Sequence, residues 1–353
     1  MSQFYKLSIK DIQRETDKCV TLSFDVPNKL KEVFNYKAGQ YLTLKTTING
    51  EEIRRDYSIC SASKSEELKV AVKEVENGMF SKFANRVLKP NDVLEVAPPN
   101  GRFIFEPKPE KTRTVVAFAA GSGITPIMSI AKTILSQEPK SNFVLIYGNK
   151  TPKDTIFFQE ILDLHHENLD NFNLQLVFSQ SEEENALFGR IEKSTVNFIV
   201  KNKYKHLHID SFYICGPEQM INTVQDVLLQ NGVKKEAIHF ELFTTSKSEN
   251  EMQTEGSTSN DETTVTVFVD DDETTFKMSR KKSVLEAALA EKIDAPYSCQ
   301  GGICSSCVAR LKEGEVEMRQ NNILTENEVS EGLILTCQAH PLTSKIVVDY
   351  DDI

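Results

Sequence analysis

The chain has 353 residues, 39% of them hydrophobic, which suits globular folding but is long for one ordinary domain. Its net charge is −11, and residues 246–353 hold the whole acidic excess with 21 acids against 10 bases, which disfavours nucleic-acid binding. No stretch approaches the roughly 20 apolar residues that cross a bilayer, so we expect a cytoplasmic protein without membrane insertion.

Short alternating runs separated by Gly, Pro and Asn fill the chain from Tyr5 to about Phe105. This pattern predicts antiparallel strands that close into a small barrel. Residues 79–88 have helical spacing and lie between the last two strands. The strands are expected at 18–26, 39–46, 67–75 and 92–98.

Two short segments of this barrel can meet a bound group. Arg55, Tyr57 and Ser58 follow a predicted strand, and their side chains can pair with a phosphate, stack on a flat heterocycle and hydrogen-bond a ring nitrogen. The same residues also suit an ordinary strand edge. Gly78 and Ser81 begin the predicted helix, whose N–H groups suit a second phosphate or are simply a helix start.

From Thr114 onward the apolar runs become continuous, and helical stretches such as 126–135 and 218–230 follow them. Buried parallel strands joined by crossover helices have this pattern. We therefore predict a parallel sheet with strands at 114–120, 143–148, 174–179 and 212–216.

Two turns of this sheet suit a dinucleotide. The segment 121–126, GSGITP, follows the first strand and opens a helix, so its glycines can let a pyrophosphate approach backbone N–H groups. The segment 213–217, YICGP, ends a later strand, where ligands of open parallel sheets gather. Cys215 within it also suits a small buried hydrophobic residue.

Residues 246–263 form the one clear linker, because Met252 is their only large apolar residue and they show no periodicity. We expect this segment to be flexible. The part that follows predicts a compact α+β domain with a hairpin, a helix and later strands at 264–279, 283–292, 308–318 and 345–352.

Four cysteines of this last part are grouped, as Cys299-x4-Cys304-x2-Cys307 followed by Cys337. This is the spacing with which plant-type ferredoxins hold a 2Fe-2S cluster. The alternative is structural zinc, which favours two paired C-x2-C knuckles and so fits less well.

These signals combine into an electron path. A nicotinamide delivers two electrons as a hydride, whereas a 2Fe-2S cluster accepts one, so a carrier that splits the pair must lie between them. A flavin in the barrel would serve, because flavins exchange electrons singly or in pairs. The order of the parts along the chain, namely barrel, nucleotide domain, linker and cluster domain, is then consistent with an electron path that ends at the cluster.

The segments RDYS, GSGITP, YICGP, IHFELF, APYSCQGGICSSC and LTCQAHPLTSKIVVDYD carry a resemblance to a known family. The first 245 residues resemble the ferredoxin-NADP reductase superfamily, and the whole chain resembles, in domain order, the reductase subunits of phenylacetyl-CoA epoxidases. The resemblance implies an antiparallel FAD-binding β-barrel at 1–106, an α/β parallel-sheet NAD(P)-binding domain at 107–245, the flexible linker at 246–263, and an α+β ferredoxin-like (β-grasp) 2Fe-2S domain at 264–353.

The resemblance also implies roles for residues. Ser58, Cys215 and Glu241 would be catalytic, with Cys215 beside the nicotinamide. Glu241 and Phe243 match an E-x-F element that reaches the flavin; in many relatives an aromatic residue ends the chain there, whereas Phe243 continues into the linker. Other cofactor contacts would come from Arg55, Tyr57, Ser58, Gly78, Ser81, Gly121, Gly123, Thr125, Pro126 and Gly216, and the cluster ligands would be Cys299, Cys304, Cys307 and Cys337.

The coenzyme and the partner stay open. Close relatives suggest NADPH. Glu182, Glu183 and Glu184 follow the third sheet strand, where a 2′-phosphate would sit, and Arg190 is the nearest basic candidate, so the charges leave NADH open. The implied electron acceptor is a diiron oxygenase, with a steroid hydroxylase or desaturase as alternatives. A different class is a zinc-stabilised interaction protein that has lost its cofactors. The acidic C-terminal part suits either solubility or a docking face.

Overall fold

The computed structural model describes residues 3–243 and 262–353. Its contacts divide the chain into two compact units, one running from Phe4 to Phe243 and one that holds residues 262–353. Most of the predicted linker, 246–261, lies outside the described residues, while Glu262 and Thr263 already belong to the first strand of the second unit.

The first unit begins with an antiparallel barrel, as predicted. Its sheet has the strand order β4-β3-β6-β1-β2-β5, and a bridge between Ile59 and Val70 closes it. Alternate side chains such as Leu7, Leu22 and Leu42 fill the interior. The elements are β1 (Tyr5–Thr16), β2 (Cys19–Asp25), η1 (Asn28–Leu30), β3 (Tyr41–Ile48), β4 (Glu51–Ser58), β5 (Leu68–Lys73), α1 (Met79–Arg86) and β6 (Val93–Val96).

One placement in the barrel was wrong. The segment Arg55 to Ser58 does not follow a strand but forms the end of β4, which pairs along its whole length with β3. The charged residues Glu51, Glu52 and Arg55 obscured this strand in the sequence, because exposed positions of a barrel strand need not be apolar.

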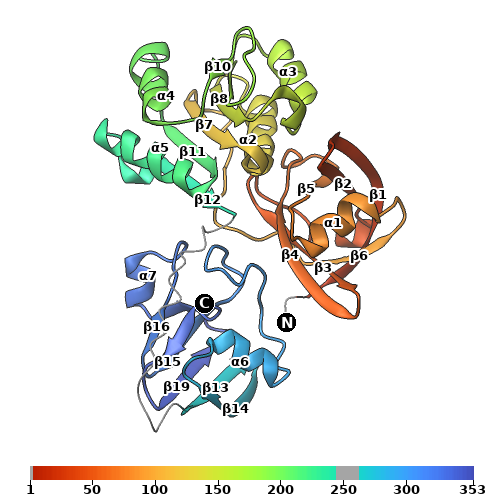
Figure 1. Cartoon of the computed structure of the whole chain (residues 1–353), viewed down its shortest axis with the longest axis vertical. Helices are drawn as coiled ribbons and strands as arrows, with labels where there is room; N and C mark the ends of the chain where they lie inside the picture. The colour runs from red at the N-terminus through yellow and green to blue at the C-terminus, as the bar shows by residue number, and fades with distance from the viewer. Residues whose placement is uncertain (1–2, 244–261) are drawn as a thin grey trace. The chain divides into compact units, whose positions relative to one another are not determined.

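A parallel sheet completes the first unit, also as predicted (Figure 1). Its strand order is β10-β9-β8-β7-β11-β12, and every neighbouring pair is parallel. The elements are β7 (Thr114–Ala120), η2 (Gly121–Gly123), α2 (Ile124–Gln137), β8 (Asn142–Asn149), η3 (Pro152–Asp154), α3 (Phe158–Glu167), β9 (Phe172–Phe178), β10 (Leu187–Phe188), α4 (Lys193–Asn197), η4 (Phe198–Lys203), β11 (Ser211–Gly216), α5 (Glu218–Gln230), η5 (Lys235–Ala237) and β12 (Ile238–Leu242).

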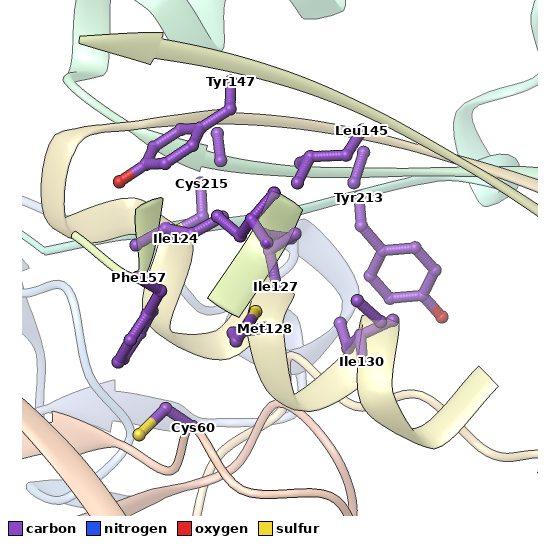
Figure 2. Close-up of a cluster of buried hydrophobic side chains, with 14 of the residues drawn as sticks. Cys60, Ile124, Ile127, Met128, Ile130, Leu145, Tyr147, Phe157, Tyr213 and Cys215 are labelled. Carbon is purple, nitrogen blue, oxygen red and sulfur yellow. The ribbon is translucent and has the colours of Figure 1, made fainter. Parts of the chain in front are cut away.

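The barrel and the parallel sheet share a core within this unit. Figure 2 shows Cys60, from the barrel, on the side of Met128 and Phe157, and all three side chains are buried in one cluster. Helix α2 also hydrogen-bonds the barrel, because Ser129 Oγ donates to Ser61 O at 2.6 Å and Thr133 Oγ1 accepts from Ser63 N at 3.0 Å. This packing fixes the end of β4 relative to the glycine turn before α2.

The second unit is the predicted α+β domain. Its sheet has the order β14-β13-β19-β15-β17, with β13 and β19 parallel, and the apolar face of α6 packs on it around Val265 and Val267. The elements are β13 (Glu262–Val269), β14 (Asp272–Ser279), α6 (Val284–Ala290), β15 (Val308–Glu313), β16 (Val316–Met318), α7 (Glu326–Ser330), β17 (Leu333–Leu335), β18 (Ala339–Pro341) and β19 (Lys345–Asp349). None of the helices in the described part of the chain is long and apolar enough to cross a membrane.

Candidate functional site

The glycine turn and the end of β11 lie against each other. A Cβ on Gly123 would come within 2.1 Å of Cys215 O and 2.7 Å of Gly216 N, so only glycine allows the two backbones this close. Strands β7 and β11 are neighbours, and the strand order reverses between them, which is where open α/β sheets bind ligands. The glycine turn and the end of β11, the two segments predicted to bind the nucleotide, therefore lie together at one site.

The turn itself is locally ordered. Thr125 Oγ1 donates to Ser122 O at 3.0 Å, and Tyr147 Oη donates to Gly121 O at 3.0 Å from β8. Pro126 lies in the first turn of α2, where its missing N–H leaves no hydrogen bond unmade. The N–H groups at this helix start suit an anion.

The end of β4 meets the end of the parallel sheet. Ser58 Oγ donates to Glu241 Oε2 at 3.3 Å, which joins two residues 183 positions apart. Burial raises the pKa of Glu241 to about 8, and the Asp56 carboxylate adds to this rise while the Ser58 hydroxyl opposes it. A carboxyl in this state can hold and release a proton near neutral pH.

Cys215 lies in the same neighbourhood. Its thiol is fully buried, and burial together with the field of Glu241 raises its pKa, so it stays neutral. Cys215 and Glu241 are direct partners in the pairing of β11 with β12. The structure thus brings the three predicted catalytic residues together from the barrel and from two sheet strands.

The remaining predicted flavin residues surround the end of β4. Arg55 is exposed, and the ring of Tyr57 packs on Phe80 of α1 with centroids 5.4 Å apart. Ser81 Oγ accepts from Val75 N at 3.2 Å and donates to Gly78 O at 3.4 Å. This hydroxyl is therefore engaged inside its own turn, and Gly78 is the N-cap of α1.

Phe243 and Arg190 are the remaining predicted cofactor residues. Phe243 is half-buried and packs against the shared core. Arg190 is exposed and follows the edge strand β10, and the next residue, Ile191, is buried with its side chain 3.1 Å from where a Cβ on Gly148 of β8 would be.

Sequence reasoning missed Lys73, at the end of β5. Its Nζ lies 3.5 Å from where a Cβ on Gly121 would be, so this barrel cation reaches the glycine turn. No local signal marks it, because the contact exists only once the barrel has packed on α2.

The four grouped cysteines form two pairs in the second unit. Cys299 interacts with Cys304, and Cys307 with Cys337. Hydrogen bonds from the Cys304 thiol and from nearby backbone N–H groups, that of Gly301 at 3.3 Å among them, lower the pKa of Cys299 to about 6 even though burial opposes the change. Thiolates are what iron binds, so the donor set suits the predicted group.

The segment that carries the first three of these cysteines turns tightly. Among the described residues, no group of three His, Cys, Asp or Glu side chains is placed to hold one metal ion. Gly302 has a φ of +69°, and a Cβ there would lie 2.8 Å from Gln320 O, so the segment wraps tightly at this residue.

Known domain families match consecutive parts of the chain. They are an oxidoreductase FAD-binding domain at residues 6–105, an oxidoreductase NAD-binding domain at 118–226 and a 2Fe-2S iron-sulfur cluster binding domain at 267–342. The last match also argues against the zinc-stabilised interaction protein considered above.

Similar proteins cover nearly the whole chain. One component of the 1,2-phenylacetyl-CoA epoxidase of Escherichia coli (strain K12) is 36% identical over 99% of both chains. The ferredoxin reductase component of 3-ketosteroid-9-alpha-monooxygenase from Rhodococcus rhodochrous is 30% identical over 98% of this chain and 96% of its own. The structure of phthalate dioxygenase reductase shares the fold with a TM-score of 0.63, 24% identity and 98% coverage of each chain.

The domain matches confirm the predicted cofactor set of FAD, nicotinamide nucleotide and 2Fe-2S cluster. The chain therefore belongs to the ferredoxin-NADP reductase superfamily, in the group with a C-terminal 2Fe-2S domain, and is an NAD(P)H oxidoreductase that transfers electrons.

Proposed function

We propose that this chain is the reductase of a diiron oxygenase that epoxidises phenylacetyl-CoA, and that it works in the cytoplasm. The 36% identity to an epoxidase component over 99% of both chains supports the choice of partner. The similarity to a ketosteroid monooxygenase reductase over nearly the same length makes another oxygenase the alternative. Seven free cysteines, four of them grouped for metal, suit a reducing compartment.

The hydrogen bond between Ser58 and Glu241 carries the proposal for the reductase site. It joins the barrel, which would hold FAD, to the sheet edge that would hold the nicotinamide. When bound, the flavin supplies hydride acceptance and single-electron release. Glu241, with its raised pKa, would hold the proton that accompanies hydride chemistry, Ser58 would orient that proton, and neutral Cys215 would shape the nicotinamide side.

Residues around this junction would bind the two nucleotides. For FAD we propose Arg55, Tyr57 and Ser58, with backbone N–H groups at Gly78 and Ser81 facing phosphate and Phe243 near the ring. Gly121, Gly123, Thr125, Pro126 and Gly216 would receive the nicotinamide nucleotide, and Lys73 would add a positive charge at its pyrophosphate.

The far end of the coenzyme would lie toward β8 and β9, away from Cys215. Arg190 after β10 and the acids Glu182 to Glu184 after β9 are exposed there with opposite charges. The 2′-phosphate of NADPH would be attracted by Arg190 and repelled by the acids Glu182 to Glu184. Preference for NADPH would therefore depend on Arg190, and replacing Arg190 by Met would lower the affinity for NADPH more than for NADH.

Two experiments test the proposed function. Stopped-flow reduction of the purified protein with NADPH and NADH in parallel, followed by flavin and iron-sulfur absorption, should show both chromophores reduced; absence of either would refute the electron path. Mixing the protein with the catalytic components of phenylacetyl-CoA epoxidase should give NAD(P)H-dependent epoxide. Electron delivery to a steroid hydroxylase instead would favour the alternative partner.

We propose domain limits of 1–106, 107–245 and 264–353, the last extended to include Glu262 and Thr263 of β13, with a linker between the second and third domains. The linker proposal is supported by the composition of residues 246–263, which offers almost no apolar surface to bury. We propose that the linker lets the 2Fe-2S domain approach first the flavin and then the oxygenase.

A further inference from the structure

Ser298 has a buried hydroxyl without a partner. The residue directly precedes Cys299 and is 1% exposed. In the part of the chain that the structure describes, its Oγ is one of a few buried side-chain polar atoms that make no hydrogen bond. Leaving a buried donor unsatisfied costs free energy of folding, so folded proteins rarely do it without a reason.

In the segment around Ser298, backbone N–H groups donate hydrogen bonds to cysteine sulfur atoms. Gly301 N donates to Cys299 Sγ at 3.3 Å, and the N–H groups of Ile303 and Cys304 also favour the Cys299 thiolate. The N–H of Gly302 does the same for Cys337. Backbone donors thus meet the thiolates of this segment. The Ser298 hydroxyl, one residue before Cys299, is a further donor that still needs an acceptor.

The position of Ser298 sets it apart from similar groups. Within residues 262–353, three buried side-chain atoms lack partners, namely Ser298 Oγ, His340 Nδ1 and Tyr350 Oη. Of these, only Ser298 is the immediate chain neighbour of a predicted cluster ligand. A bound group with sulfur acceptors would give the Ser298 hydroxyl a hydrogen-bond partner. This would remove the free-energy cost of burying that hydroxyl.

We propose that the Ser298 hydroxyl donates a hydrogen bond to a sulfur of the bound 2Fe-2S cluster and so raises the reduction potential of that cluster. The inference rests on the assignment of the four cysteines as cluster ligands. Reduction adds negative charge to a centre already bound by thiolates, so a donor stabilises the reduced state more than the oxidised state. Hydrogen bonds to the sulfurs are among the factors that set such potentials.

The test is a redox titration of the full-length holoprotein, followed by the electron paramagnetic resonance of the reduced cluster. In Ser298→Ala, we expect the ratio of oxidised to reduced cluster at the wild-type midpoint to rise about tenfold, as a lost charge-assisted hydrogen bond implies. For a one-electron couple this is a shift of about 59 mV to more negative potential.

Matched variants separate the hydroxyl from packing. Ser298→Thr keeps the hydroxyl and Ser298→Val has the same shape without it, so the inference requires a higher potential in the Thr variant. This pair also decides the matter if Ser298→Ala holds no cluster. Thr266→Val removes a buried hydroxyl that bonds Thr275 Oγ1 at 2.9 Å on the sheet, and should leave the potential unchanged.

The outcomes are distinguishable from those of the proposed function. Absence of iron-sulfur absorption in the wild type would refute the ligand assignment itself. A normal cluster in every variant, with equal potentials for Ser298→Thr and Ser298→Val, would overturn only the role given to Ser298.

Discussion

Single residues set the chemistry of the first unit where separate elements touch. Gly123 allows the glycine turn to lie against Cys215. Glu241 accepts a hydrogen bond from Ser58, and the negative charge of Asp56 helps to raise its pKa. Each of these residues is ordinary by type. Its role comes from a neighbour in space that is distant in sequence. A substitution should therefore have its effect by changing the contact with that neighbour.

Replacing Gly123 by Ala should damage coenzyme binding. The added methyl would lie 2.1 Å from Cys215 O, so the end of β11 or the turn must move. We expect the KM for NAD(P)H to rise at least tenfold while flavin content stays normal, as steady-state kinetics and absorption would show. Ser122→Ala, next to it, removes only a hydroxyl and should be close to wild type. Normal kinetics in Gly123→Ala would contradict the close approach.

Glu241 should make stability depend on pH. Its pKa is about 8 when folded, against about 4.3 for an ordinary Glu, so between these values the folded chain binds the extra proton. Its contribution to stability is therefore complete below about pH 4 and is lost as pH rises toward 8. In Glu241→Gln, the free energy of unfolding should fall less steeply between pH 5 and 8.

Urea unfolding at several pH values measures this slope. Glu167→Gln changes an exposed acid of the same unit and serves as the control. Parallel stability curves for wild type and Glu241→Gln would show that Glu241 does not hold its proton in the folded state.

At the scale of elements, one buried ion pair ties the start of β7 to the end of α2. Arg113 donates to Glu138 through Nε at 3.0 Å and Nη2 at 2.5 Å, and Glu138 is fully buried. Burial works to raise the pKa of Glu138, but hydrogen bonds from Arg113, Lys108 N and Ser141 outweigh it and lower the pKa. The pair anchors the strand and helix that flank the glycine turn.

Breaking this pair should destabilise the first unit strongly. Arg113→Met would leave the Glu138 carboxylate buried without its cation, which costs about 3 kcal/mol in comparable cases. Thermal or urea unfolding of the flavin-containing unit checks this. Lys37→Met breaks a solvent-exposed pair with Glu106 and should have a much smaller effect. Equal losses in the two variants would mean that burial of the pair does not matter.

At the scale of the whole molecule, the chain consists of two units with separate cores. The barrel and parallel sheet pack as one body from Phe4 to Phe243, and the ferredoxin-like unit has a core cluster of its own. Under the proposed function, electrons pass from the first unit to the second.

Shortening the segment 246–263 by half should separate the two electron transfers. Flavin reduction by NAD(P)H takes place inside the first unit and should keep its rate, whereas reduction of an external one-electron acceptor should slow severalfold. Stopped-flow spectroscopy follows both steps, and a variant with the same length but scrambled order serves as the control. Equal slowing of both steps would argue against a moving 2Fe-2S domain.

Local patterns of residues, together with the family resemblance that they carry, were enough to predict the architecture and the cofactors. Alternating and continuous apolar runs indicated the barrel, the parallel sheet and the α+β domain, although charged residues hid β4. Glycine turns and the cysteine spacing are equally local, because nucleotide phosphates and iron bind short segments of backbone and thiolate.

Which of these residues meet depends instead on tertiary packing. The approach of Gly123 to Cys215, the bond from Ser58 to Glu241 and the reach of Lys73 to Gly121 join segments about 50 to 180 residues apart. The buried, unpartnered state of Ser298 is likewise a property of packing. Burial changes the pKa of Glu241 because it removes water from a charge, and water is removed only when the barrel and the sheet have come together.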